Sequence, residues 1–349
     1  MRLEARNTVP LGIVVAAPLV AIAVALALAG GLIAAAGVNP FTAYFEMVKG
    51  ALGSRLAVTE MLTRACPLIL TGLAAAVAFR ARLWNIGAEG QFFVGALAVA
   101  ALGHSALSGL PGLFGIAVLC GTGMAAGALL LAGPAFLRLR FGVDEVVTTL
   151  LMNFIVILFV GLMVEGPLRD PLAFGWPSSV PVDGDFRLPD LVARTRLHIG
   201  LLVAIVGAAI VWLIQSRTVF GMEARAAGHN PRAAAFAGVS LPKTLMGVAL
   251  LSGALAGLAG AIEVLGVTAS VTTTMSPGFG YAGIVVAMLA ALHPVGGVAA
   301  ATFVATVFVG ADAMSRATGV PSFIADVIVA LALLTMLIAL LFTQYRIRP

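Results

Sequence analysis

The sequence predicts an all-α, polytopic membrane protein with about ten transmembrane helices, some of them broken or short, and with both termini in the cytoplasm. Of its 349 residues, 61% are hydrophobic and only 10% are charged, whereas soluble domains carry about 25% charged residues. The mean hydropathy of +1.10 excludes a soluble protein. Apolar runs long enough to cross a hydrocarbon layer of about 30 Å recur along the chain.

These apolar runs place the membrane-spanning helices in order. The first run follows the opening MRLEARN and is about 25 residues long, which exceeds the core of a signal peptide, so we expect a retained span. Between the eighth and ninth runs, HPVGG (293–297) marks either a tight turn or a break within one long element. The ten runs lie near residues 10–36, 58–79, 88–104, 112–137, 146–165, 197–215, 243–266, 281–293, 296–314 and 322–342.

The basic residues predict the orientation of the chain. With the N-terminus inside, the cytoplasmic segments hold 12 of the 20 lysines and arginines, as expected of short cytoplasmic loops. Arginines that flank spans account for the net charge of +5 without a nucleic-acid partner. Two connections are longer, an external loop at about 166–196 and a cytoplasmic segment at about 216–242. No separate soluble domain is evident, so residues 1–349 form a single transmembrane domain.

A polar, glycine-containing stretch, RARLWNIGAEGQFFVG (80–95), interrupts the apolar pattern and contains Asn85, Glu89 and Gln91. Backbone that leaves a helix at membrane depth must be buried in protein or line a cavity, because lipid cannot satisfy its N–H and C=O groups. Broken helices of this kind are typical of transport pathways. We therefore expect these three side chains to shape or gate a pathway.

Three of the polar side chains admit two interpretations each. Glu89 either contacts a solute or pairs with Arg80 or Arg82 to fix the turn, since an unpaired carboxylate at this depth is costly. Thr149 and Asn153 are four residues apart and share one face of a predicted helix. Facing a pore, they offer hydrogen bonds to a polar solute; facing a neighbouring helix, they hold the two helices together.

A short helix is predicted within the cytoplasmic segment, at residues 230–238. Asn230 is a good N-cap, Pro231 suits the first helical position, and Gly238 suits the residue after the end. The helix is about 10 Å long, and alone in water it is marginal, so it needs a partner surface. Phe236 is a natural knob for a groove in another protein; the alternative is a connector that lies on the membrane surface.

The chain shows no pattern for catalysis, metal binding or nucleotide binding. Its four histidines fall at predicted segment ends or surfaces and lack the spacing of metal ligands. Lys243 and Thr244 lack the glycines of a phosphate-binding loop, and no serine has the nucleophile-elbow pattern. We expect no catalytic residue, no metal site and no cofactor on this chain, and any ATP must bind to another chain.

Two segments resemble the signatures of a known family. WNIGAEGQFFVGA (84–96) is similar to the NIG-x-EGQ signature of permease subunits of ATP-binding-cassette (ABC) importers for simple sugars, nucleosides and branched-chain amino acids. ARAAGHNPRAAAFAGVS (224–240) resembles the coupling-helix region of the same family. The similarity extends from about residue 45 to residue 342. Within the family, FGVDEVVTTLLMNFIVILFVGLMVEGPLRDP (141–171) is most similar to the nucleoside-type permeases.

The resemblance implies a permease subunit that moves nucleosides inward, purine nucleosides in particular, by alternating access driven by separate ATPase subunits. A simple-sugar (ribose-type) permease is the alternative, and an ion-coupled secondary carrier that uses Glu89 and Glu263 is a further one. The chain is then a transport subunit rather than an enzyme, with two inverted groups of helices. It is expected in the inner (plasma) membrane of a bacterium, as a multi-pass protein.

The implied partners are a second permease, homologous or identical, cytoplasmic ABC ATPases that bind ATP and Mg, an extracytoplasmic solute-binding protein and the lipid bilayer. The residues expected to line or gate the pathway are Asn85, Glu89, Gln91, Thr149 and Asn153. The residues implied to form the coupling helix, which sits in a cleft of the ATPase, are Asn230, Pro231, Arg232, Ala233, Ala234, Ala235, Phe236, Ala237 and Gly238.

Overall fold

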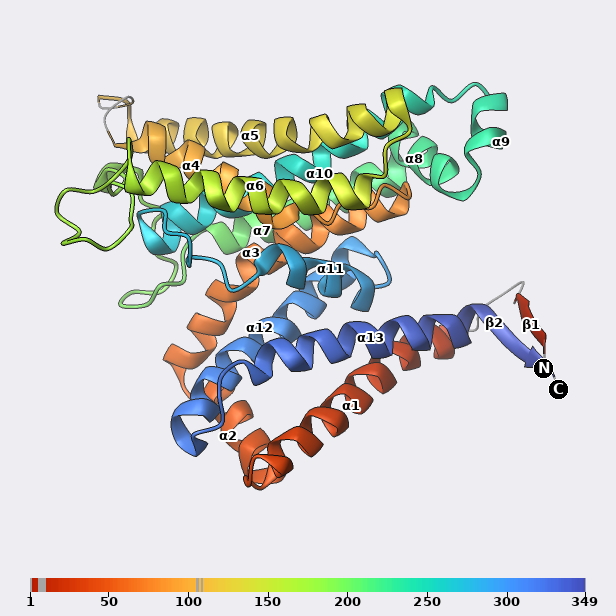
Figure 1. Cartoon of the computed structure of the whole chain (residues 1–349), viewed down its shortest axis with the longest axis horizontal. Helices are drawn as coiled ribbons and strands as arrows, with labels where there is room; N and C mark the ends of the chain where they lie inside the picture. Colours follow the sequence, from red (N-terminus) through yellow and green to blue (C-terminus); the bar gives the residue numbers. More distant parts are fainter. Residues whose placement is uncertain (1, 6–10, 105–106, 108, 349) are drawn as a thin grey trace.

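The computed structural model describes residues 2–5, 11–104, 107 and 109–348 (Figure 1). This part of the chain is helical apart from a two-stranded antiparallel ribbon in which β1 (Arg2–Ala5) pairs with β2 (Tyr345–Arg348). The all-helical prediction is therefore correct except for this ribbon. The helices are α1 (Leu11–Ala35), α2 (Pro40–Leu52), α3 (Arg55–Arg80), α4 (Ala88–Gly103), α5 (Gly112–Phe141), α6 (Glu145–Glu165), η1 (Gly184–Phe186), α7 (Gly200–Arg217), α8 (Val219–His229), α9 (Pro231–Phe236), α10 (Leu241–Glu263), η2 (Val264–Thr268), α11 (Phe279–Leu289), α12 (Pro294–Thr318) and α13 (Ile324–Gln344).

A helix occupies each of the ten segments that the hydropathy pattern predicted as spans. Among the described residues, six helices are long and apolar enough to cross a membrane, or up to seven if α1 and α2, which are bent by 116°, count as one span. This finding supports a multi-pass membrane protein, while the count of ten spans stays a prediction. The six are α3, α5, α6, α7, α10 continued by η2, and α12.

The HPVGG stretch marks the start of a new helix after a tight turn at residues 290–292, rather than a break within one long element. Helix α11 ends at Leu289, and α12 begins at Pro294 with His293 as its N-cap. The His293 ring accepts a hydrogen bond from the backbone N–H of Gly296 at 3.3 Å. Proline at the first helical position needs no N–H partner there, so this sequence starts a new helix.

The bundle has two distinct ends (Figure 1). Helix α9 and both strands of the ribbon lie toward one end, called here the α9 end. The long connection between α6 and α7 lies at the opposite end, called the loop end. Placing the ribbon at the α9 end agrees with termini on the same side as the segment 216–242. The cytoplasmic assignment of that side remains a prediction.

Helices α3 and α10 form the centre of the bundle. In their most apolar stretches 89% of α3 and 67% of α10, taken with η2, is buried. The backbone of α10 lies directly against the backbones of α5 and α4. A Cβ atom at Gly257 would collide with the carbonyl of Gly123, and a Cβ atom at Gly260 would collide with the carbonyl of Phe92. Close approach of this kind is how small residues pack membrane helices.

Candidate functional site

The break between α3 and α4, residues 81–87, is held by its own side chains, and it is buried except at Arg82, Trp84 and, in part, Ile86. Arg82 takes a left-handed backbone conformation (φ 52°) as the chain leaves α3. Asn85 and Gln91 exchange two amide hydrogen bonds, with Asn85 Nδ2 donating at 2.9 Å and Gln91 Nε2 donating at 2.8 Å. Asn85 Oδ1 also accepts from the N–H of Gly87 at 3.0 Å, and Asn85 Nδ2 donates to Ser252 Oγ of α10 at 3.0 Å. This network fixes the path of the break.

Helix α6 holds the same break from a second side. The Asn153 side chain accepts from the N–H of Gly90 at 2.8 Å and donates to the carbonyl of Ile86 at 2.9 Å. Thr149 Oγ1 accepts from the N–H of Ile86 at 3.2 Å. These bonds satisfy backbone groups that lipid cannot satisfy. The predicted shared face of Thr149 and Asn153 thus meets the broken backbone, in keeping with the interpretation that they hold helices together.

Glu89 binds the start of a distant helix rather than an arginine. Its Oε2 accepts from the backbone N–H of Gly280 at 2.6 Å, and the side chain is 3% exposed. Gly280 lies in the first turn of α11, where unpaired N–H groups favour a negative charge. No ion pair joins Glu89 to Arg80 or Arg82 in the described part of the chain. The predicted arginine pairing is therefore wrong, because the carboxylate faces α11.

The connection between η2, which continues α10, and α11 is a second break, residues 269–278. Each break is hydrogen-bonded to the central helix that precedes the other break. Near the first break, Ser252 of α10 donates to the carbonyl of Ala74 in α3 at 2.7 Å and accepts from Asn85. At the end of the second, Thr71 of α3 donates to the carbonyl of Phe279 at 2.9 Å. Each central helix thus supports the break that follows the other. The two inverted groups of helices that the resemblance implies stay a prediction.

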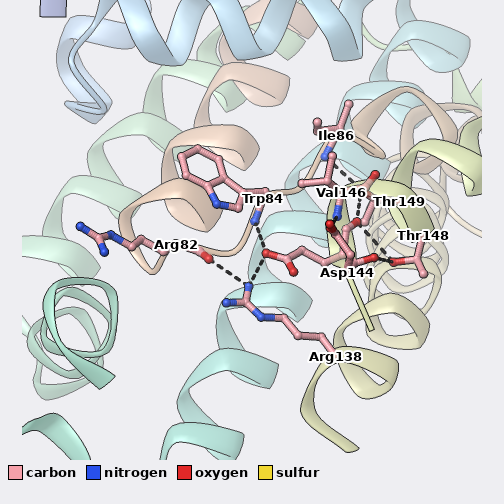
Figure 2. A network of polar contacts seen from close by, with 9 residues as sticks. Arg82, Trp84, Ile86, Arg138, Asp144, Val146, Thr148 and Thr149 are labelled. Carbon is pink, nitrogen blue, oxygen red and sulfur yellow. Dashed lines mark hydrogen bonds and ion pairs between the residues drawn. The ribbon is translucent and has the colours of Figure 1, made fainter. Parts of the chain in front are cut away.

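A further polar cluster, not expected from the sequence, locks the break at the α9 end (Figure 2). Arg138 of α5 donates to the Glu145 carboxylate at 2.6 Å and to the carbonyl of Arg82 at 2.9 Å. The N–H of Trp84 donates to the same carboxylate oxygen at 3.3 Å. The seven-residue spacing of Arg138 and Glu145 across the turn from α5 to α6 was visible in the sequence, but their contact with Arg82 and Trp84 needs the fold.

The five side chains predicted for the pathway therefore meet at one place and are all buried: Asn85, Glu89, Gln91, Thr149 and Asn153. Each of them bonds to protein groups, and their bonds bind the first break to α6, α10 and α11. Their chemistry here is to hold irregular backbone within the bundle. Their predicted part in lining or gating a pathway stays a prediction.

The short helix α9 forms where the sequence places it. Asn230 Oδ1 accepts from the N–H of Ala233 at 3.1 Å, and Gly238 takes the left-handed conformation (φ 91°) that a helix end favours. Helix α9 lies at one end of the bundle (Figure 1), and its last residue, Phe236, is 97% exposed. An aromatic ring held this far into solvent is available to a partner surface.

Helix α8 joins α9 to the first break. A Cβ atom at Gly228, in the last turn of α8, would collide with the carbonyl of Arg80 at the end of α3. The N–H of Asn230 bonds to the carbonyl of Ala226, so α8 continues into the cap of α9. The helix that leads into α9 is therefore in direct contact with the residues that precede the break.

No group of three or more histidine, cysteine, aspartate or glutamate side chains that could hold a metal ion occurs among the residues the structure describes. His198 lies at a helix end, one of the two positions expected for it, but it is buried rather than on the surface. It lies just before α7 and is 1% exposed, and its Nδ1 accepts from the N–H of Gly200 at 3.1 Å. Burial lowers the pKa of His198 to about 4, with a further lowering by Arg187 that Asp190 opposes. The neutral ring suits its role as an acceptor.

Comparisons with known proteins identify the family. Residues 57–344 match the family described as the permease component of the branched-chain amino acid transport system. The guanosine ABC transporter permease protein NupP of Bacillus subtilis is 36% identical over 91% of this chain and 91% of its own length. A glucose ABC transporter permease protein of Haloferax volcanii is 32% identical over 99% of this chain and 93% of its own length.

A second guanosine ABC transporter permease protein of Bacillus subtilis, NupQ, is 27% identical over 70% of this chain and 78% of its own length. No solved structure matches the chain. The family match covers most of the sequence, including both breaks and α9, and the two most similar of these relatives extend over nearly all of it. The chain therefore belongs to the family of branched-chain amino acid transport system permease components.

Proposed function

We propose that this chain is the transmembrane permease subunit of an ABC importer that moves nucleosides, purine nucleosides in particular, into the cell by alternating access. The observation that carries the proposal is the relationship to a guanosine permease at 36% identity over nine-tenths of both chains. ATP, with Mg, is bound and hydrolysed by separate ATPase subunits. The protein resides in the inner membrane of a bacterium.

Helix α9 is the element proposed to meet the ATPase. It is short, it projects from the bundle, and it ends in the exposed Phe236 (Figure 1). Its residues, from Asn230 to Gly238, are the ones that resemble the coupling helix. The contact of Gly228 with Arg80 gives movement of α9 a direct route to the first break.

Two more partners complete the proposed importer. A second permease is supported by the similarity of this chain to two guanosine permease proteins of one bacterium, NupP and NupQ. An extracytoplasmic solute-binding protein is expected at the loop end. There, Phe174 is fully exposed and Trp176 is 63% exposed within the connection between α6 and α7, and large exposed apolar side chains that gather on a surface mark interaction sites.

A simple-sugar permease is the second candidate function. It is favoured by the glucose permease relative, which aligns with 99% of this chain. The two candidates differ in the solute alone, since both place the same fold between an ATPase and a solute-binding protein.

Uptake of labelled adenosine, guanosine, uridine and ribose, in cells with and without the gene, tests the proposal. We expect loss of purine nucleoside uptake with ribose uptake unchanged. Loss of ribose uptake alone would move the protein to the sugar branch. Uptake that responds to a proton or sodium gradient but not to ATP in proteoliposomes would instead indicate an ion-coupled carrier.

A further inference from the structure

Two adjoining cavities lie beside the connection between α6 and α7, since Arg196 of that connection lines both. The larger has a volume of about 910 Å³ and the smaller about 390 Å³, and both are lined by Glu60 and Arg196. Each lies in the range of about 300–1,000 Å³ that is usual for small-molecule sites. The smaller cavity is built from α3, the end of α10, the second break and α12. It thus lies against the break that follows α10.

The smaller cavity contains a deep carboxylate with no protein partner. Glu263, the last residue of α10, lines this cavity and is 7% exposed. Within the described residues no hydrogen bond or ion pair reaches its carboxylate, although its backbone carbonyl accepts from Thr268 at 3.4 Å. Among the described residues, Gln215 Oε1 is the side-chain oxygen that is both inaccessible and without a hydrogen-bond partner. The Glu263 oxygens do not share this state, so they retain some accessible surface. The carboxylate therefore faces the cavity.

One of the two arginines on the cavity wall, Arg64, is already engaged. Arg64 pairs with Asp312 at 2.8 Å and with Glu60 at 3.7 Å, both on the cavity wall. An unpaired carboxylate within a membrane protein is costly unless hydrogen-bond donors approach it. Glu263 can therefore accept hydrogen bonds that no described protein group donates. A solute that enters the cavity can supply them.

Groups of both charges line the smaller cavity. Three carboxyl groups, from Glu60, Glu263 and Asp312, accompany two guanidinium groups, from Arg64 and Arg196. The hydroxyl of Thr63 donates to the carbonyl of Thr59 at 2.8 Å, which leaves its oxygen as an acceptor. The described wall thus presents acceptors at Glu263 and Thr63 together with donors at Arg196, a combination that suits a neutral solute with several hydroxyl groups.

We propose that the cavity at Glu263 is a solute-binding station on the pathway, in which the Glu263 carboxylate accepts hydrogen bonds from the vicinal hydroxyls of a neutral ribosyl solute. A carboxylate has two oxygens and accepts from two donors at once, and hydrogen bonds to a charged group are stronger than those between neutral groups. This inference rests on the proposed function, because it names the part of the nucleoside that the permease contacts.

The test compares guanosine with 2′-deoxyguanosine in cells that contain the complete importer. The solute-binding protein is the same in all strains, so a change in the uptake ratio between wild type and a permease variant reports the permease. In Glu263→Gln we expect guanosine uptake to fall by about 10- to 100-fold, the loss expected for hydrogen bonds to a charged group. Uptake of 2′-deoxyguanosine, which lacks the vicinal pair, is expected to fall by much less.

Glu165→Gln is the matched control, since Glu165 is an exposed carboxylate at the loop end, and it is expected to leave the ratio unchanged. Glu263→Asp keeps the charge and should retain more of the preference than Glu263→Gln, with permease abundance measured in the membrane of every strain. An unchanged ratio in Glu263→Gln, or an equal loss for both solutes, overturns the inference. Absence of nucleoside uptake in the wild type would instead overturn the proposed function, so the two failures are distinguishable.

Discussion

Replacing Asn153 by leucine is expected to loosen the first break, because one side chain satisfies two backbone groups there. Leucine keeps the approximate size of the side chain but removes the bonds to the N–H of Gly90 and the carbonyl of Ile86. A buried backbone group without a partner costs about 1–3 kcal/mol, which gives about 2–6 kcal/mol for the pair. Measured hydrogen bonds between membrane helices average about 0.6 kcal/mol, so we expect a loss near the lower end, about 2 kcal/mol.

The assay is thermal unfolding of the purified importer in detergent, with uptake measured in parallel. We expect a Tm lower by several degrees and reduced uptake for Asn153→Leu. Tyr281→Phe is the matched control: it removes an acceptor 3.1 Å from Asn153 Nδ2 while both backbone groups keep their partner. A wild-type Tm for Asn153→Leu, or an equal loss for Tyr281→Phe, would refute the claim that Asn153 supports the break.

Two further perturbations test other contacts. Gly228→Val should reduce uptake while the protein still inserts, because the added side chain forces α8 away from Arg80. Gly133→Val is the control, since a Cβ atom there meets nothing within 4 Å. Equal uptake by the two variants would contradict the proposed route from α9 through α8 to the first break. For His198, the folded pKa of about 4 lies below the ordinary value of 6.5, so the unfolded chain binds the extra proton and stability should fall as pH drops from about 6.5 to about 4. The loss is on the order of 3 kcal/mol, and Tm measured across this pH range should fall less steeply in His198→Gln; an equally steep fall would show that another group is responsible.

Local signals in the sequence were sufficient to predict α9 and the first break. The cap formed by Asn230 and Pro231 and the left-handed Gly238 are chemical features of neighbouring residues, and the structure shows both. The break was visible because polar residues interrupted an apolar run. In each case the residues that favour the local conformation lie within a few positions of it in the sequence.

Other features depended on distant parts of the chain. The partner of Glu89 is Gly280, 191 residues away, and nothing near Glu89 distinguishes that partner from Arg80 or Arg82. Helix α2 was missed because its mixed polarity does not read as a span, although Asn39 caps it by accepting from the N–H of Phe41 at 2.9 Å. The second break was expected only as a connection between the spans predicted at 243–266 and 281–293, because nothing in its sequence predicts the hydrogen bond from Thr71 of α3 to the carbonyl of Phe279.

The most direct test of the account is whether α9 couples this permease to ATP hydrolysis. The measurement is solute-stimulated ATP hydrolysis by the reconstituted importer carrying Phe236→Asp, with Phe236→Leu as the control that keeps an apolar side chain. We predict that Phe236→Asp inserts normally but loses stimulated hydrolysis and uptake, whereas Phe236→Leu keeps most of both, because the exposed ring is the part of α9 that enters a partner surface. Wild-type hydrolysis and uptake in Phe236→Asp would contradict the central claim.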